Sequence, residues 1–137
     1  MTQSVITKPL PEPDEDARPF WDGAMEGRLM LVRCTGCGTV RLPWTKYCDE
    51  CLSEQTTWIQ ASGRGSLRTF GIMHQRYHPA FEPDLPYNVA IVELDEGPRI
   101  PTNIVNTTND ELRVGMPVEV VFERHEDVAL PKFQPMR

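Results

Sequence analysis

Apolar and polar residues alternate along much of the second half of this chain, a pattern typical of short β-strands. The alternation is clearest over 117–123, where Val118 and Val120 are expected to face inward and Glu119 outward. The other predicted strands cover 66–77, 87–94, 99–105 and 128–133. Five strands in about 70 residues are too few for an immunoglobulin sandwich and favour a small closed barrel, with the five-stranded OB-fold as the first candidate.

The region before these strands begins with a short amphipathic segment. Residues 19–27 predict a helix, with Pro19 in its first turn and Gly27 at its end. Phe20 and Trp21 fall on one face of this helix. A helix of this length is marginal alone, so its aromatic face needs a cover. The cover is either the chain's own core or another subunit, and the sequence leaves both open.

All four cysteines fall in two pairs, Cys34 with Cys37 and Cys48 with Cys51, with the spacing C-x2-C-x10-C-x2-C. Each pair lets two thiolates reach one ion, and Gly38 permits the tight turn after the first pair. Two such pairs complete a tetrahedral site of four sulfurs, which favours zinc. A segment this short is expected to fold only together with its metal. Four thiolates leave no open position for substrate, so we expect the zinc to be structural.

Two disulfides, a thioredoxin-like redox pair and rubredoxin-type iron are the alternatives to zinc. Disulfides are not expected in a chain without a secretory signal. A thioredoxin-like pair needs a single C-x2-C within a βαβ unit, which the pattern lacks. Iron uses the same four ligands, so the spacing leaves it open.

These patterns divide the chain of 137 residues into four predicted segments. They are a disordered acidic and proline-rich tail (1–17), an N-terminal helix (18–27), a zinc ribbon (28–58) and an OB-fold (59–137). The predicted fold class is therefore mainly β: a helix and a rubredoxin-like zinc ribbon followed by a five-stranded barrel. No apolar run is long enough for a transmembrane helix, and the expected location is the cytoplasm.

The formal net charge is −6, which opposes a nucleic-acid-binding function, because such domains usually carry a basic excess. Basic residues nevertheless outnumber acidic ones over 28–78, and a local patch of this kind favours a small anion. No nucleophile–base pair stands out. Ser66 lies in a glycine turn that is no nucleophile elbow, and His74 and His78 would sit about 13 Å apart on a strand. The sequence argues against an independent enzyme.

The order of these motifs resembles the zinc-ribbon plus OB-fold proteins associated with acyl-CoA metabolism, long called domain of unknown function 35. The resemblance covers about residues 18–134. Besides the cysteine pairs, its carriers are the segments 18–21, 86–97, 114–118 and 130–133. Members of this family accompany thiolase-fold enzymes, including thiolases, acyltransferases and steroid side-chain retro-aldolases, and others accompany hotdog-fold enoyl-CoA hydratases. The resemblance implies a non-catalytic subunit of a hetero-oligomer that stabilises a thiolase-like partner and helps to form its CoA channel.

The same resemblance implies two ligands, a structural Zn²⁺ and a coenzyme A thioester shared with the partner. It does not fix which residues contact them beyond the cysteines. Our candidates for the CoA phosphates are Arg41, Lys46, Arg64 and Arg68, and for the partner interface Phe20 and Trp21. Ordinary solvated charge is the alternative for the four cations. Two other functions stay open, a nucleic-acid-binding module and a rubredoxin-like electron carrier.

Overall fold

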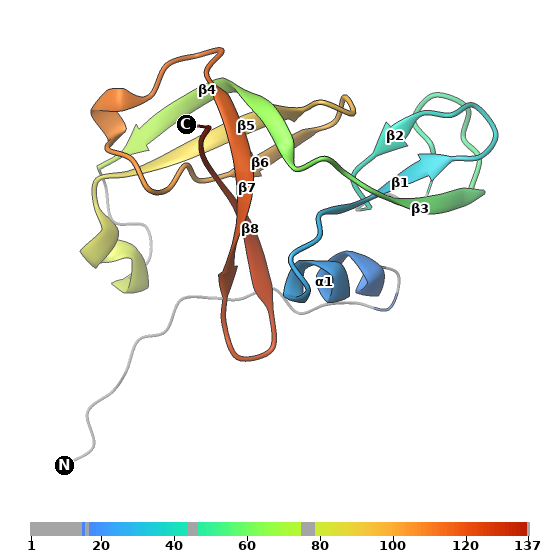
Figure 1. The fold of residues 1–137 in the computed structure, drawn as a ribbon, viewed down its shortest axis with the longest axis horizontal. Helices are drawn as coiled ribbons and strands as arrows, with labels where there is room; N and C mark the ends of the chain where they lie inside the picture. Colours follow the sequence, from blue (N-terminus) through green and yellow to red (C-terminus); the bar gives the residue numbers. More distant parts are fainter. Residues whose placement is uncertain (1–14, 16, 44–46, 75–78, 137) are drawn as a thin grey trace.

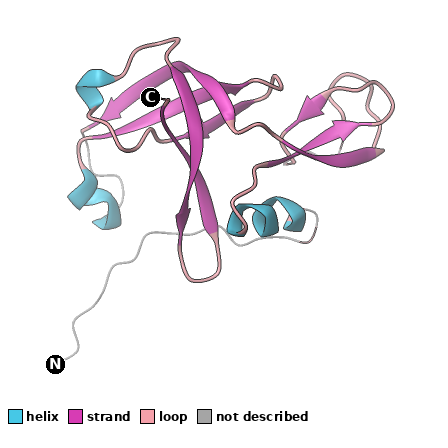
Figure 2. Cartoon of the chain, viewed as in Figure 1, coloured by secondary structure: helices cyan, strands magenta, loops and turns pink. Residues whose placement is uncertain are grey.

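The computed structural model describes residues 15, 17–43, 47–74 and 79–136. A short helix and two antiparallel sheets make up most of this chain (Figures 1 and 2). In chain order the elements are α1 (Arg18–Met25), β1 (Met30–Cys34), β2 (Val40–Arg41), β3 (Thr56–Gln60), β4 (Arg64–Met73), η1 (Pro79–Asp84), β5 (Tyr87–Leu94), β6 (Arg99–Thr102), η2 (Asn109–Glu111), β7 (Pro117–Arg124) and β8 (Ala129–Pro135). The predicted tail lies almost wholly outside the described residues.

The smaller sheet has the order β2-β1-β3, and its loops carry the cysteine pairs. The central strand β1 pairs with β3 over five positions, from Met30 opposite Gln60 to Cys34 opposite Thr56. Its pairing with the two-residue strand β2 is much shorter. The sheet therefore holds Cys34 firmly at its end and leaves the rest of the cysteine module to loops.

The larger sheet has the order β6-β5-β4-β7-β8, with every neighbouring pair antiparallel. A bulge at Arg68, between the pairs of Leu67 and Thr69 with β5, lets the long central strand β4 bend. The two ends of the sheet then meet at a parallel bridge between Ile104 and Phe133. This closure gives the OB-fold barrel, and it confirms the predicted class: mainly β, with a helix and a cysteine-bearing ribbon before a five-stranded barrel.

One hydrophobic core joins the ribbon, the helix and the barrel. Phe20 of α1 and Leu31 of β1 are almost completely buried in the same cluster as Leu67, Val92 and Phe133 of the barrel. The helix lies beside the β7–β8 hairpin in Figure 1 and contacts β1, β7 and β8. Among the described residues no helix has both the length and the apolar character needed to cross a lipid bilayer.

Candidate metal centre and adjoining pocket

The four cysteines converge at the end of the ribbon away from the helix. Cys34 ends β1 and Cys37 follows it in the next turn, whereas Cys48 and Cys51 come from the loop between β2 and β3. All four Sγ atoms lie within 4.8 Å of one another, with 3.4 Å between Cys34 and Cys51 and 3.6 Å between Cys37 and Cys48. A tetrahedral ion with Zn–S bonds of 2.3 Å would separate its sulfurs by roughly 3.8 Å. The sulfur positions therefore fit one such ion.

Two turns of the same kind position these sulfurs. The N–H of Gly38 donates to the carbonyl of Cys34 at 2.8 Å, and the N–H of Leu52 donates to the carbonyl of Cys48 at 2.8 Å. Backbone N–H groups also face the sulfurs, as Glu50 does toward the Sγ of Cys48 at 3.4 Å. Such donors stabilise the thiolate form that a metal requires.

The thiols have unequal pKa values in the absence of a cation. A backbone hydrogen bond from Cys37 lowers the pKa of Cys34, and hydrogen bonds with Thr39 lower the pKa of Cys37. A backbone hydrogen bond from Ser53 lowers the pKa of Cys51, but the thiols of Cys34 and Cys37 outweigh it and raise this pKa to about 12. Clustered thiolates repel one another, so near neutral pH the last proton leaves only when a cation replaces it. The donor set thus fits a structural zinc.

Burial divides the four ligands into two kinds. Cys34 and Cys48 are fully buried, whereas Cys37 and Cys51 reach the surface. A zinc ion held by all four sulfurs would cross-link the two turns and keep no open coordination position. The four cysteines can therefore stabilise the fold around a metal, and they leave no coordination position at that metal for a substrate.

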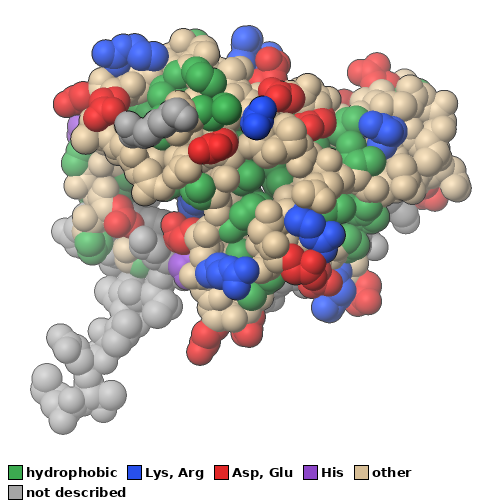
Figure 3. All heavy atoms as spheres, in the orientation of Figure 1, with side chains coloured by type: hydrophobic (Ala, Val, Ile, Leu, Met, Phe, Trp, Pro, Cys, Tyr) green, Lys and Arg blue, Asp and Glu red, His purple; other side chains and the backbone are tan. Residues whose placement is uncertain are grey.

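The four candidate CoA cations lie on two different strands or outside the described residues. Arg41 lies on β2 and is 8% exposed, in the ribbon. Arg64 and Arg68 are exposed on β4, where Arg64 stands opposite Glu119 and Arg68 occupies the bulge. Lys46 lies outside the described residues. On the face drawn in Figure 3, basic and acidic side chains are interspersed. Their role toward CoA remains a prediction.

The two aromatic residues of α1 have different surroundings. Phe20 is 1% exposed and packs into the chain's own core. Trp21 is half-buried and meets Phe20 edge-on, with 5.0 Å between the ring centroids. The chain's own core therefore covers Phe20, whereas Trp21 stays partly exposed.

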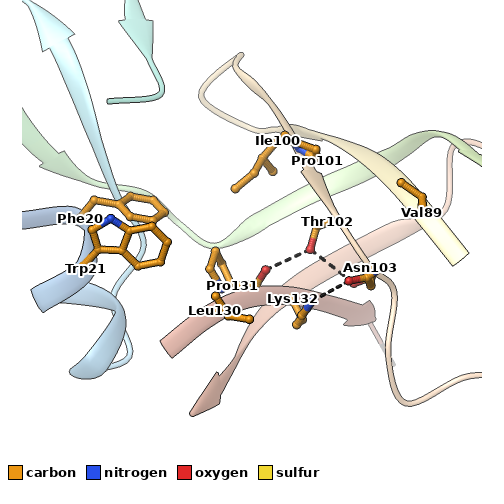
Figure 4. A pocket seen from close by; sticks show the side chains of 10 residues that line it. All are labelled: Phe20, Trp21, Val89, Ile100, Pro101, Thr102, Asn103, Leu130, Pro131 and Lys132. Carbon is orange, nitrogen blue, oxygen red and sulfur yellow. Dashed lines mark hydrogen bonds between the residues drawn. The ribbon is translucent and has the colours of Figure 1, made fainter. Parts of the chain in front are cut away.

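Beside Trp21 a pocket of about 340 Å³ opens between α1 and the place where β6 meets β8 (Figure 4). Most of its wall is apolar, and the lining residues are Phe20, Trp21, Val89, Ile100, Pro101, Thr102, Asn103, Leu130, Pro131 and Lys132. The hydroxyl of Thr102 donates to the carbonyl of Pro131 at 3.0 Å, and the ammonium of Lys132 donates to the Oδ1 of Asn103. The pocket therefore combines an apolar wall with one cation.

Sequence reasoning did not select Thr102, Asn103 or Lys132. Thr102 and Pro131 are 29 positions apart in the chain and meet only because the barrel closes between β6 and β8. The one available signal was the segment 130–133, which the family resemblance singled out without assigning it a role.

Profiles of two protein domains match adjoining stretches of the chain. Residues 21–57 match the rubredoxin-like zinc ribbon domain of ChsH2, and residues 58–123 match the C-terminal OB-fold domain of ChsH2. A DUF35 domain-containing scaffold protein of Methanocaldococcus jannaschii is 39% identical over 97 residues, which are 70% of this chain and 68% of that protein. This chain belongs to the ChsH2/DUF35 family.

Two further relatives carry functional names. A chain of the structure called Ltp2-ChsH2(DUF35) aldolase superposes with a TM-score of 0.80 at 35% identity, covering 92% of this chain and 98% of that chain. A probable enoyl-CoA hydratase alpha subunit of Thermomonospora curvata is 36% identical over 129 residues, 93% of this chain. The chain spans only 40% of that hydratase subunit.

Proposed function

We propose that this chain is a non-catalytic accessory subunit of an acyl-CoA thiolase or retro-aldolase complex, in which a thiolase-fold partner carries the chemistry. The observation that carries the proposal is the match over nearly the whole of both chains to the DUF35 chain of an aldolase. The cysteine cluster supports it, because four sulfurs on one ion can stabilise a shape but leave no catalytic position.

The pocket beside Trp21 supports the second part of this proposal, a contribution to the CoA channel. Its volume falls in the range of ligand sites, and its apolar wall carries a single cation, Lys132. A partner that covers the mouth of the pocket would enclose it between the two subunits. The apolar wall would then accommodate the uncharged part of an acyl-CoA, and the ammonium would attract a phosphate or carboxylate.

The test of the accessory role is co-expression with a thiolase-fold candidate, with each protein also purified alone. We expect a stable hetero-oligomer, cleavage or thiolysis of acyl-CoA by the complex, and no turnover by this chain alone. The proposal is wrong if this chain stays monomeric beside every thiolase-fold candidate, or if it converts acyl-CoA unaided.

The test of the channel role is Lys132→Glu in the purified complex. We expect a higher KM for the CoA thioester, by about tenfold, because a repulsive charge replaces an attractive one in the pocket. Arg33→Glu makes the same charge change on an exposed position of β1 and is the matched control. Equal KM values for the two variants would remove Lys132 from the channel.

A second candidate rests on the hydratase relatives. The match to the alpha subunit from T. curvata covers 93% of this chain, so the same fold also occurs in a protein named as a hydratase subunit. In this alternative the chain accompanies a hotdog-fold enoyl-CoA hydratase. Assembly with hotdog-fold subunits, and hydration of an enoyl-CoA by the resulting complex, would favour it over the aldolase.

A further inference from the structure

The two cysteine turns differ at one equivalent position. Gly38 and Leu52 each follow the second cysteine of a pair, and each donates its N–H to the carbonyl of the first cysteine at 2.8 Å. Both residues have a positive φ, +83° for Gly38 and +63° for Leu52. Glycine adopts this left-handed conformation without steric cost, whereas a leucine there is strained. The first turn therefore uses the favourable residue and the second turn does not.

Burial of the Leu52 side chain does not offset this strain in the isolated chain. It is 75% exposed, which makes it the most exposed of the large apolar side chains among the described residues. Neither backbone preference nor burial explains a leucine at this position. The turn that positions Cys48 imposes the positive φ, but the exposed side chain gains no burial in the folded monomer that would favour a leucine there.

The surroundings of Leu52 indicate what it meets. We call residues 47–54 the knuckle tip. Cys48 donates its N–H to the carbonyl of Ser53 and its carbonyl accepts from the N–H of Leu52, so the two ends of this loop lie together; Tyr47, which directly precedes Cys48, is 52% exposed. The knuckle tip also carries the exposed acids Asp49, Glu50 and Glu54 and contains no Lys or Arg. It thus combines two exposed apolar side chains with three exposed acids.

We infer that the knuckle tip is the surface through which this subunit binds its thiolase-fold partner, with Leu52 inserted in an apolar pocket that Lys or Arg side chains border. The inference rests on the proposed function and adds the contact that assembles the complex. We assign Lys or Arg side chains to the border of the partner's pocket because the exposed acids of the knuckle tip would be attracted by a basic surface and repelled by an acidic one. Metal binding would strengthen this contact in two ways. It would fix the conformation of the loop that carries Leu52, and a zinc–tetrathiolate would add negative charge beside the acids.

The decisive variant is Leu52→Gly, because the inference predicts opposite changes in stability and in assembly. Removing the strain should raise the Tm of the isolated, zinc-loaded chain by about 3 °C. Removing the side chain should weaken the Kd for the purified thiolase-fold partner by about tenfold or more. The zinc content should stay equal to that of the wild type. A residue with a purely structural role would not change these two quantities in opposite directions.

Two other variants keep the result interpretable. Leu52→Ala removes most of the side chain but keeps a non-glycine residue at positive φ, so it should weaken assembly without the gain in Tm. Val114→Ala truncates another exposed apolar side chain, 67% exposed and outside the knuckle tip, and should leave the Kd unchanged.

The possible failures are distinguishable. If the wild type binds its partner and Leu52→Gly binds equally well, the knuckle tip is not the contact and the accessory role still stands. If Leu52→Gly weakens binding only together with loss of zinc, the side chain acts through the metal site and the inference is wrong. If the wild type binds no thiolase-fold partner at all, both the inference and the proposed function fail.

Discussion

Gly65 lies on β4 where both neighbouring strands pair with it, opposite Leu94 of β5 and Val118 of β7. A Cβ at this position would lie 2.4 Å from the carbonyl oxygen of Glu93 and 2.9 Å from the side chain of Val92. Neither neighbour can move without opening the β4–β5 ladder. Gly65 is therefore the residue that permits the close contact between two strands of the barrel.

We predict that Gly65→Ala lowers the free energy of unfolding by about 1–3 kcal/mol, as overpacking of a close-packed site does. Gly71→Ala is the matched control, because it lies on the same strand with nothing within 4 Å of an added Cβ. That control should be neutral or stabilising by less than about 1 kcal/mol. Denaturant titrations of both variants and the wild type make the comparison, and equal losses in the two variants would contradict it.

The individual residues of the site differ in how far the sequence could predict them. The spacing of the cysteine pairs encodes a local geometry, so the four ligands were predictable without any knowledge of the fold. Lys132 was not, because its place in the pocket depends on barrel closure between distant segments. Leu52 gave no signal either, since its residue type disfavours the conformation that it adopts.

Among the elements, the ribbon depends on two different stabilising interactions. Its strand β1 places Leu31 in the core that the barrel shares, whereas the loops that carry the cysteines rely on short turns and on sulfur ligation. The base of the ribbon is therefore stabilised by hydrophobic packing, and its end would be stabilised by a metal held by the four sulfurs. Loss of the metal should affect only one of these regions.

We predict that a zinc chelator exposes the backbone of residues 34–53 to hydrogen exchange while the strands β4–β8 keep their protection. The metal cross-link is lost, but the apolar core of the barrel is not. Hydrogen exchange followed by mass spectrometry, with and without chelator, reports both regions in one experiment. Uniform loss of protection over the whole chain would show that the barrel does not fold independently of the metal.

The thiol pKa values predict the direction in which pH acts on the metal site. In the metal-free fold the pKa of Cys51 is about 12, above its ordinary value of 9.0. This protonated thiol contributes stability that is fully present below pH 9.0 and is lost as the pH rises toward 12. Metal binding acts in the opposite direction, because the ion must displace thiol protons. Zinc affinity should therefore fall as the pH falls.

We expect the apparent Kd for zinc to weaken by about tenfold or more for each pH unit lost below neutrality, which corresponds to release of at least one proton per ion. A competition titration against a chromophoric chelator at several pH values measures it, with the proton release checked by calorimetry in two buffers. An affinity that does not change with pH would mean that the four thiols are already ionised without metal.

The elements of the barrel were largely predictable because alternation and turn residues determine them locally. The predicted strand 87–94 coincides with β5. The predicted strand 99–105 was too long, since β6 ends at Thr102 and the following residues turn to bridge Phe133. The bulge at Arg68 depends on the pairing between strands, so the sequence pattern alone does not predict it.

For the molecule as a whole, the shared core and the charge matter more than any single motif. Ribbon, helix and barrel share one core, so they present one surface to a partner and not two independently moving modules. The formal net charge of the whole chain is −6, and acidic and basic side chains are interspersed on the face shown in Figure 3. A long polyanion would meet repulsion over most of its contact, whereas a small anion could bind beside a single cation.

This charge distribution opposes the nucleic-acid alternative, although zinc ribbons and OB-folds serve that function elsewhere. Binding of single strands requires a continuous basic groove, with phosphate neutralisation supplying the affinity. We therefore expect no saturable binding tighter than about 10⁻⁴ M when a labelled oligonucleotide is titrated with zinc-loaded protein at low salt and followed by fluorescence anisotropy. Micromolar affinity that falls steeply with added salt would instead identify a basic groove. The chain would then bind nucleic acid in addition to the proposed accessory role.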